Sequence, residues 1–300
     1  MKRFLIAGGN GQLAQALHLS VPPEFECTLA TREVVDITDA AAVRAALGRH
    51  QPAAVINGAA YNLVDAAEGD GMAAAVAINV HGVATLTHAC RDAGIPLVHF
   101  STDFVFDGRK LMPYVEEDAT GPISTYGATK LAGENIALLG SDRNLVIRVC
   151  RLFGPAVEPA AGSNRKPAGN FPLLMIRLGR ERESLRVVSD QIGTPSYTPD
   201  LARGVWQLLQ AGATGLFQVS NEGEVSFDDY AREVFRQAGV SCQVESVTSA
   251  EYAAPARRPA YSVMSNRKAI AAGMLPLRDW REALGEFLEF NRKDAKAQRK

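Results

Sequence analysis

The sequence predicts an α/β protein built on a doubly wound parallel sheet, with a smaller α/β domain toward its C-terminus. Short apolar runs alternate with longer, alanine-rich stretches of helical period through the first half of the chain, as in βαβ units. The first apolar run leads directly into a glycine-rich turn and a helix. The length of 300 residues, at roughly 150 residues per domain, adds the expectation of two domains.

Apolar runs bounded by turn residues are the strands expected in the first half, at 4–7, 27–30, 54–57, 97–100 and 145–149. Stretches of helical period are the helices expected between them, at 12–19, 39–50, 76–93 and 125–139. Asp39 opens an Ala- and Val-rich run and is the expected N-cap of the second helix. Gly94, followed by Pro96, marks the expected end of the third helix.

The second half of the chain is less regular. Residues 154–169 mix Pro, Gly, Ser and charged residues without a period, which predicts a mobile loop. Strands are expected at 185–188 and 215–219, and helices from 198, from 226 and over 280–290. The Thr-Pro-Asp of 198–200 supplies a cap and a first turn, and Ser226 with Asp229 has the spacing of a capping box. Residues 291–300 are mostly charged, so we expect them to fray or to be disordered.

Composition and charge exclude several classes of protein. With 32 Lys and Arg against 33 Asp and Glu, the net charge of -1 lacks the basic surplus of a nucleic-acid-binding protein. No apolar run reaches the roughly 18 residues of a membrane span, and the N-terminus passes into a short strand rather than a signal peptide. Four cysteines without a C-x-x-C pair fit a reducing compartment, so we expect a cytoplasmic protein. The five histidines lack metal-ligand spacing, and no metal is expected.

A glycine-rich turn follows the first expected strand. Gly9, Gly11 and Ala14 fit the pattern G-x-G-x-x-A, and Gly8 in place of Gly9 gives a variant with one more residue between the glycines. Small residues let backbone N–H groups reach a dinucleotide pyrophosphate at the helix N-terminus, so a Rossmann-type domain is expected. The cofactor-binding residues expected in this turn are Gly8, Gly9, Asn10, Gly11, Gln12 and Leu13. A tight turn without a ligand is the alternative.

The end of the second expected strand bears on the choice of cofactor. A site for NAD places an acid about 20 residues after the glycines, where it binds the ribose hydroxyl groups. This sequence has Arg32 there and no carboxylate, which favours the 2′-phosphate of NADPH, with NADH as the second choice. A solvated arginine is the alternative. Asp36 and Ile37 follow and are expected near the adenine.

Tyr126 and Lys130 lie four residues apart at the start of an expected helix, on one face. A nearby ammonium group lowers the phenol pKa from its usual value of about 10, which makes tyrosine a usable acid near neutral pH. Thr102 follows the strand at 97–100, at the sheet edge where open α/β sheets bind ligands. We expect these three residues to be catalytic. A surface pair on a helix is the alternative for Tyr126 and Lys130.

In this order, the glycine fingerprint, Thr102, Tyr126 and Lys130 make the chain resemble the extended short-chain dehydrogenase/reductases. Further motifs resemble the dTDP-4-dehydrorhamnose reductases over nearly the whole chain. These motifs are Gly11-Gln12-Leu13, Ala59-Ala60-Tyr61, Ser101 to Gly108, Pro113-Tyr114-x-Glu116, Gly133-Glu134, Asn170-Phe171, Asp190-Gln191-x-Gly193-Thr194-Pro195, Arg258-Pro259 and Trp280. The stretch 187–201 is the most specific, because short-chain reductases in general lack it.

The resemblance implies a mechanism and a set of site residues. NAD(P)H would reduce the C4 ketone of dTDP-4-dehydro-L-rhamnose, with Tyr126 protonating the alkoxide. Lys130 would lower the Tyr126 pKa and hold the nicotinamide ribose, and Thr102 would hydrogen-bond the ketone oxygen. The further cofactor-binding residues that it implies are Ala59, Ala60, Tyr61 and Asn79. The substrate-binding residues expected are Asp103, Phe104, Arg151, Asn170 and Arg258.

The same resemblance divides the chain. We expect a dinucleotide-binding domain at 1–150 with about 185–222, and a nucleotide-sugar-binding domain at 151–184 with 223–290. The expected partner is the nucleotide sugar rather than a nucleic acid or a membrane, and a homodimer is left open.

Three positions depart from the family pattern. Phe104 and Arg151 stand where a tyrosine and a tryptophan are usual, and Asn62 stands where a threonine is common. Because the ends of the strands line the ligand cleft, we expect Arg151 to clamp the acidic part of the nucleotide sugar. An arginine that points to solvent is the alternative.

Other functions on the same scaffold stay open at this point. Dehydratases place an Asp-Glu pair directly after the threonine, where this chain has Asp103 and Phe104, and epimerases hold NAD tightly. Relatives of the family also serve as non-catalytic regulatory subunits that bind a cofactor and a partner enzyme. The intact Thr102, Tyr126 and Lys130 favour an enzyme.

Overall fold

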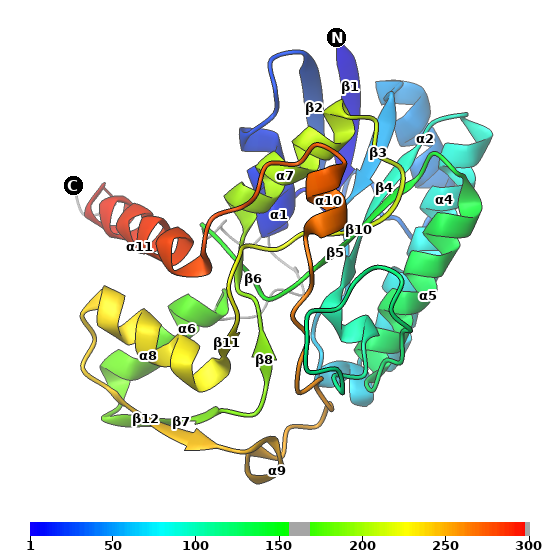
Figure 1. The fold of residues 1–300 in the computed structure, drawn as a ribbon. Helices are drawn as coiled ribbons and strands as arrows, with labels where there is room; N and C mark the ends of the chain where they lie inside the picture. Colours follow the sequence, from blue (N-terminus) through cyan, green and yellow to red (C-terminus); the bar gives the residue numbers. More distant parts are fainter. Residues whose placement is uncertain (156–168, 298–300) are drawn as a thin grey trace.

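The computed structural model describes residues 1–155 and 169–297, and its centre is a parallel sheet of six strands (Figure 1). The strands, in spatial order, are β10 (Gly215–Gln218), β5 (Leu145–Val149), β4 (Leu97–Thr102), β3 (Ala54–Asn57), β1 (Lys2–Ala7) and β2 (Phe25–Ala30). The chain order reverses between β1 and β3, so the carboxyl ends of these two strands form a switch point of the kind that binds ligands. The predicted doubly wound sheet is confirmed.

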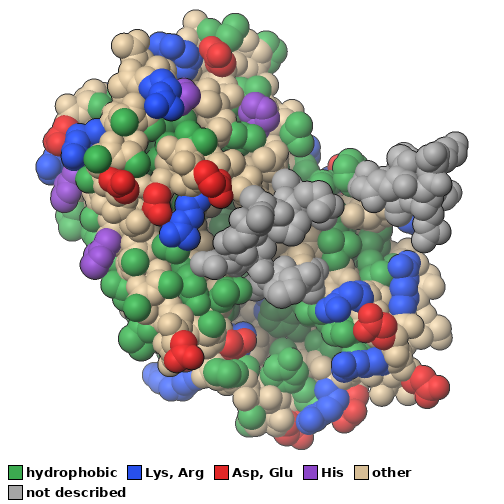
Figure 2. All heavy atoms as spheres, turned by 180° about the vertical axis from the view of Figure 1, so that it is seen from behind, with side chains coloured by type: hydrophobic (Ala, Val, Ile, Leu, Met, Phe, Trp, Pro, Cys, Tyr) green, Lys and Arg blue, Asp and Glu red, His purple; other side chains and the backbone are tan. Residues whose placement is uncertain are grey.

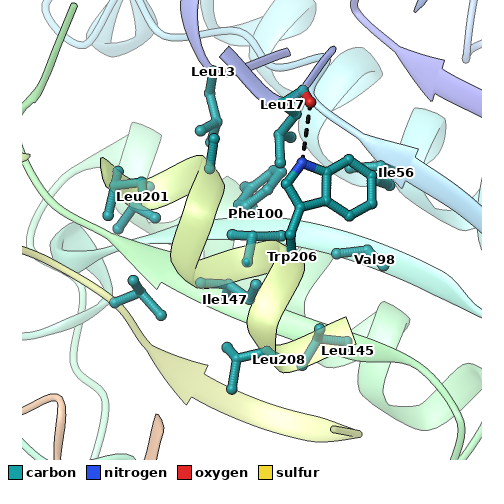
Figure 3. Packing of buried hydrophobic residues seen from close by; sticks show 14 of the residues in the cluster. Leu13, Leu17, Ile56, Val98, Phe100, Leu145, Ile147, Leu201, Trp206 and Leu208 are labelled. Atoms are coloured by element: carbon teal, nitrogen blue, oxygen red, sulfur yellow. Dashed lines mark hydrogen bonds between the residues drawn. The ribbon is translucent and has the colours of Figure 1, made fainter. Parts of the chain in front are cut away.

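Helices cover both faces of the sheet because each strand is apolar on both sides. One face carries α1 (Gln12–Leu19) and α7 (Thr198–Gln210), and the other carries α2 (Ala40–His50), α4 (Val83–Asp92) and α5 (Thr125–Gly140). On the α1 and α7 face, the Trp206 indole is 2% exposed and donates a hydrogen bond to the Leu17 carbonyl at 3.0 Å (Figure 3). This packing fixes α1, and with it the glycine turn that precedes α1.

The first-half elements follow the sequence closely. Helix α1 and strands β3 and β5 have the expected bounds. Asp39 is the N-cap of α2 and accepts hydrogen bonds from the backbone N–H groups of Ala41 and Ala42. The expected helix at 76–93 begins earlier and is composite, with α3 (Met72–Val76) and a π-helical turn, η2 (Ala77–Gly82), before α4.

The apolar stretch Met72–Asp92 forms part of the protein core. It is long enough and, at a mean hydropathy of 1.2, apolar enough to cross a membrane by length and composition alone. In the structure 44% of this window is buried, and Val83, Leu86 and Cys90 pack against the sheet. The apolar residues of this stretch therefore serve the protein core, beside α2 and α5.

A second group of elements, here called the C-terminal lobe, has its own apolar core. It consists of β7 (Ser184–Val188), which pairs in parallel with β12 (Gln243–Val247), and of α6 (Phe171–Glu181), α8 (Phe227–Ala238) and α11 (Trp280–Ala297). Trp280 and Phe287 are fully buried at its centre. On the face of the molecule that lies behind the view of Figure 1, the acidic and basic side chains of the described residues are interspersed and are not gathered by sign (Figure 2).

Short elements connect the C-terminal lobe with the six-stranded sheet and its covering helices, here called the sheet lobe. They are η1 (Ala66–Glu68), η3 (Asp103–Val105), β6 (Leu152–Phe153) with β9 (Ser196–Tyr197), β8 (Ile192–Gly193) with β11 (Val225–Ser226), α9 (Ser249–Tyr252) and α10 (Arg267–Ala271). The core residues show where the expected domain limits were misplaced. Leu185 and Val187 belong to the C-terminal lobe, whereas Ala269, Met274 and Leu277 pack with the sheet.

Helix ends in the second half differ from the sequence expectation. Tyr197 is the N-cap of α7, so Thr198 is already helical and gives no side-chain cap. Ser226 does cap α8, but the Asp229 carboxylate pairs with Arg232 at 2.9 Å instead of closing a capping box. Helix α11 continues to Ala297, into the stretch 291–300 that was expected to fray. Most of the expected loop at 154–169 lies outside the described residues.

Candidate active site

The turn between β1 and α1 is shaped to receive an anion. Gly8 has φ +74°, and a Cβ there would lie 2.5 Å from the backbone nitrogen of Ala59, so only glycine fits. The Gly11 N–H donates to the Gly8 carbonyl at 2.8 Å. Gly11 is the N-cap of α1 and provides no side chain to cap the helix, so its first N–H groups are available to a pyrophosphate. The Leu13 side chain lies in the core, which leaves only its backbone for such a ligand.

Arg32 lies beyond the end of β2 with its side chain 66% exposed. Its Nε is 3.1 Å from Asp36 Oδ2, an exposed pair of little strength. The other oxygen of Asp36 accepts hydrogen bonds from the backbone N–H and the hydroxyl of Thr38, and these bonds and Arg32 lower the Asp36 pKa against the effect of burial. Ile37 is buried beside Gly82. The Arg32 side chain is therefore largely exposed, while Asp36 is occupied by its own loop.

The loop after β3 is fastened to the helices behind it by Asn79. The Asn79 side chain accepts the Tyr61 N–H at 2.9 Å and donates to the Tyr61 carbonyl at 3.0 Å and to Thr129 Oγ1 at 3.1 Å. Both of its N–H groups are used within the protein, so the expected direct contact of this side chain with a cofactor is corrected to a supporting role. Ala60 is exposed, whereas Ala59 is half-buried and packs against the core.

Tyr126 lies in the first turn of α5, which Ser124 caps by accepting the Gly127 N–H at 3.1 Å. Its phenol lies within hydrogen-bonding reach of Thr102, at the end of β4. The Phe104 ring packs edge-on against the Tyr126 ring, with centroids 5.5 Å apart. Burial, and then the negative charge of Asp103, raise the pKa of Tyr126 to about 12, although a hydrogen bond donated by Thr102 would oppose this rise. The sequence expectation of a lowered pKa for Tyr126 is therefore wrong.

Lys130 lies one helical turn after Tyr126 and is 3% exposed. Its ammonium group donates to the Phe100 carbonyl at 2.6 Å. Burial lowers the pKa of Lys130 to about 8, and the negative charge of Glu134 opposes that shift. An amine with this pKa is charged in an appreciable fraction of molecules near neutral pH.

Behind Lys130 lies a buried ion pair that the sequence reading did not find. Glu134 and Arg148 are 1% and 2% exposed, and Arg148 Nε donates to Glu134 Oε2 at 3.0 Å. His99, on β4, is also buried near Lys130. Burial, followed by the charge of Lys130, lowers the pKa of His99 well below its usual value, so the imidazole is neutral. Asn57 holds its Nδ1 at 3.1 Å. Glu134 had a sequence signal as part of the Gly133-Glu134 motif, whereas Arg148 and His99 are marked in the sequence only as polar residues within apolar runs.

Asp103 does not face the cleft. It is 2% exposed, and its carboxylate accepts hydrogen bonds from Ser262, Cys150 and Thr102. The expected contact of Asp103 with a substrate is therefore corrected, because its side chain is used inside the protein.

Arg151 also turns inward, at a positive φ of 44°. Its guanidinium group donates to the carbonyls of Val225 and Gln191, each at 2.9 Å, and stacks over Phe227 at 3.9 Å. Both sequence readings of Arg151, a clamp on the substrate and an arginine in solvent, are wrong. The side chain joins the end of β5 to the β8 and β11 segments.

Asn170 and Arg258 likewise make internal contacts. Asn170 caps α6 and donates to the Gly154 carbonyl at 2.8 Å. Arg258 donates to Asp65 Oδ2 at 2.8 Å and to the Ala256 carbonyl. Phe104 is thus the one expected substrate residue whose side chain lies against Tyr126. No group of three or more His, Cys, Asp or Glu side chains that could hold a metal occurs within 1–155 and 169–297.

The chain is similar to several known proteins. Residues 1–292 match the family described as the RmlD substrate binding domain. A dTDP-4-dehydrorhamnose reductase from Streptomyces griseus is 39% identical over 292 residues, covering 95% of this chain and 92% of the relative. A dTDP-4-keto-6-deoxy-D-glucose reductase from Streptomyces niveus is 38% identical, covering 94% and 95%. A crystal structure of dTDP-4-dehydrorhamnose reductase from Bacillus anthracis in complex with NADP is 34% identical, covers 96% and 99%, and superposes with a TM-score of 0.87.

Proposed function

Because this chain belongs to the RmlD substrate-binding-domain family, we propose that it reduces the C4 ketone of dTDP-4-dehydro-L-rhamnose with NADPH, giving dTDP-L-rhamnose. The resemblance found in the sequence is confirmed by the family match. The observation that carries the proposal is the meeting of Tyr126, Thr102 and Lys130 at the carboxyl edge of β4. The protein is in this view an NADP-dependent oxidoreductase.

The residues of the switch point fit the cofactor. The uncapped N-terminus of α1 would bind the pyrophosphate, and Arg32 would bind the 2′-phosphate. Lys130 uses one of its N–H groups on the Phe100 carbonyl and would offer the others to the nicotinamide ribose. When bound, NADPH supplies the hydride.

Tyr126 would supply the proton. With a pKa of about 12 in the ligand-free protein, the phenol is fully protonated near neutral pH, as an acid for ketone reduction must be. The positive charge of Lys130 would stabilise the phenolate left after proton transfer, and Thr102 would hold the phenol beside the reacting oxygen.

The substrate would lie between the sheet edge and the C-terminal lobe. Phe104 packs on Tyr126 at that edge, and the family pattern places the sugar beside this position. We propose that the sheet lobe binds the dinucleotide and that the C-terminal lobe binds the nucleotide sugar. We further propose that the protein acts in the cytoplasm, with a homodimer left open.

One observation disfavours a dehydratase. An acid that acts on the sugar must face it, and the Asp103 carboxylate instead accepts hydrogen bonds from internal hydroxyl and thiol groups. A second candidate function is reduction of dTDP-4-keto-6-deoxy-D-glucose, the substrate in the name of the Streptomyces niveus relative.

The test is NADPH oxidation in the presence of each dTDP-linked 4-keto sugar, with chromatographic identification of the product. Turnover with dTDP-4-dehydro-L-rhamnose and loss of turnover in Tyr126→Phe would support the proposal. Preference for the D-glucose derivative would favour the second candidate. NADPH binding without turnover on any 4-keto sugar would favour a regulatory subunit, and stoichiometric NAD in the purified protein would favour an epimerase.

A further inference from the structure

A buried carboxylate lies directly behind the candidate active site, and the proposed chemistry does not use it. Asp103 accepts a hydrogen bond from Thr102 Oγ1 at 3.0 Å. It also accepts from Ser262 Oγ at 2.7 Å and from Cys150 Sγ at 3.1 Å. A carboxylate has no proton of its own to offer, so each of these three groups must be the donor.

The bond to Asp103 decides what the Thr102 hydroxyl can do. A hydroxyl has one proton and two lone pairs. Thr102 donates its proton in the hydrogen bond to Asp103, and one lone pair accepts the Phe104 N–H at 3.2 Å. Toward the Tyr126 phenol, which lies within hydrogen-bonding reach, Thr102 can therefore only accept. The phenol must be the donor in that contact, so the donation from Thr102 that would favour a phenolate is not available.

We propose that Asp103 is a positioning residue, which fixes Thr102 as a hydrogen-bond acceptor and thereby keeps the proton on Tyr126 until a substrate ketone takes it. The role of the ketone rests on the proposed function, whereas the orientation of Thr102 exists without any substrate. The chain order explains why one residue faces the cleft and the next faces inward, since successive residues at a strand end point to opposite sides.

The groups around Asp103 come from several elements. Cys150 and Arg151 follow β5, Tyr126 lies on α5, and Ser262 lies on the segment that passes β8, where its N–H donates to the Ile192 carbonyl at 2.9 Å. Burial raises the Asp103 pKa, and the hydrogen bonds together with the Arg151 charge oppose this rise. The negative charge of Asp103 in turn disfavours a second negative charge on Tyr126, which acts in the same direction as the proposed hydrogen-bond orientation.

The test is to remove that charge and to follow Tyr126 directly. In protein with carbon-13-labelled tyrosine, the ring carbon that bears the hydroxyl reports ionisation, and the Tyr126 signal is assigned by its loss in Tyr126→Phe. In Asp103→Asn, Tyr126 should ionise at a pH lower by about one unit than in the wild type. An unchanged or raised ionisation pH in the folded variant would overturn the proposal.

A matched control is Asp228→Asn on α8. Asp228 is also a buried aspartate that accepts hydrogen bonds from two serine hydroxyl groups, those of Ser226 and Ser246, and it lies in the C-terminal lobe. The Tyr126 ionisation pH should not change in this variant. An equal shift in both variants would mean that a general loosening of the fold, and not Asp103, causes it, and would overturn the proposal.

A second pair of variants keeps the proposal testable if Asp103→Asn does not fold. Thr102→Val removes the hydroxyl and retains the Asp103 charge, whereas Thr102→Ser retains the hydroxyl. If Thr102 accepts from the phenol, Thr102→Val should lower the ionisation pH of Tyr126 and Thr102→Ser should leave it unchanged. A rise in Thr102→Val would show that Thr102 is the donor, which contradicts the proposal.

These measurements need neither cofactor nor substrate, so they separate the two proposals. Suppose that the ionisation pH of Tyr126 falls in Asp103→Asn but the wild type reduces no 4-keto sugar. That result would support the positioning role of Asp103 and refute the proposed function. In an active enzyme, Asp103→Asn should also move the alkaline limb of kcat to lower pH while KM stays unchanged. A raised KM with an unmoved pH profile would mean that Asp103 contacts substrate instead.

Discussion

Replacing Arg151 by Met should destabilise the fold rather than weaken substrate binding. The guanidinium group donates two hydrogen bonds to backbone carbonyls at 2.9 Å and stacks on Phe227 at 3.9 Å. A hydrogen bond to a charged group contributes about 1.5 to 3 kcal/mol, and the lower end applies because these contacts are part-buried and water can reach the carbonyls in the variant. The stacking adds about 0.5 to 1 kcal/mol. The free energy of unfolding should fall by about 3 to 4 kcal/mol.

Denaturant unfolding followed by circular dichroism measures this loss. The strain of a positive φ at residue 151 is common to both side chains and cancels in the comparison. Arg186→Met is the control, because Arg186 is 55% exposed and lies 3.8 Å from Glu245, and its loss should cost less than about 1 kcal/mol. If Arg151→Met loses as little as this control, or if it stays as stable as the wild type while KM for the nucleotide sugar rises, the internal role assigned to Arg151 is refuted.

Three further predictions concern the cofactor and the acid. Arg32→Ala should weaken NADPH binding by about ten- to a hundredfold and leave NADH binding unchanged, and equal affinities of the wild type for the two cofactors in calorimetry would contradict this. Tyr126→Phe should lower kcat by about a hundredfold with little change in NADPH affinity, and a variant that retains more than about a tenth of the turnover would reassign the acid. Lys130 has its pKa lowered to about 8 in the folded protein, so the unfolded chain binds more protons above that pH. The unfolding free energy of the wild type relative to Lys130→Met should therefore rise from pH 8 toward the ordinary lysine value of 10.5, and a flat difference would contradict the burial of this amine.

The first half of the fold could be predicted because its signals are local. Residues 54–57 and 145–149 are apolar runs with clear ends, and the structure gives β3 and β5 the same bounds. The glycine turn was equally readable, since the positive φ of Gly8 and the close approach of Ala59 admit no side chain. Thr102 could be placed at the carboxyl end of β4, and Tyr126 and Lys130 reach it from α5, which packs against that strand.

The directions of the side chains around that edge could not be predicted in the same way. Whether Arg151 faces the cleft depends on the carbonyls of Val225 and Gln191, which are far away in the sequence and meet it only in the folded chain. The Tyr126 pKa was misjudged for a related reason. The spacing to Lys130 was visible, but the burial of the phenol and the position of the Asp103 charge were not.

The end of β4 shows why a site of this kind resists prediction residue by residue. Thr102 serves the cleft, and the next residue, Asp103, bonds to Ser262 on a segment that arrives from the other end of the chain. A second link across the same boundary runs from Asp65, in the loop after β3, to Arg258 at 2.8 Å. Both links join the edge that bears the candidate catalytic residues to the 258–262 segment. A structural change in the 258–262 segment should therefore displace Thr102 through the Asp103 carboxylate, without altering any residue that contacts the cofactor.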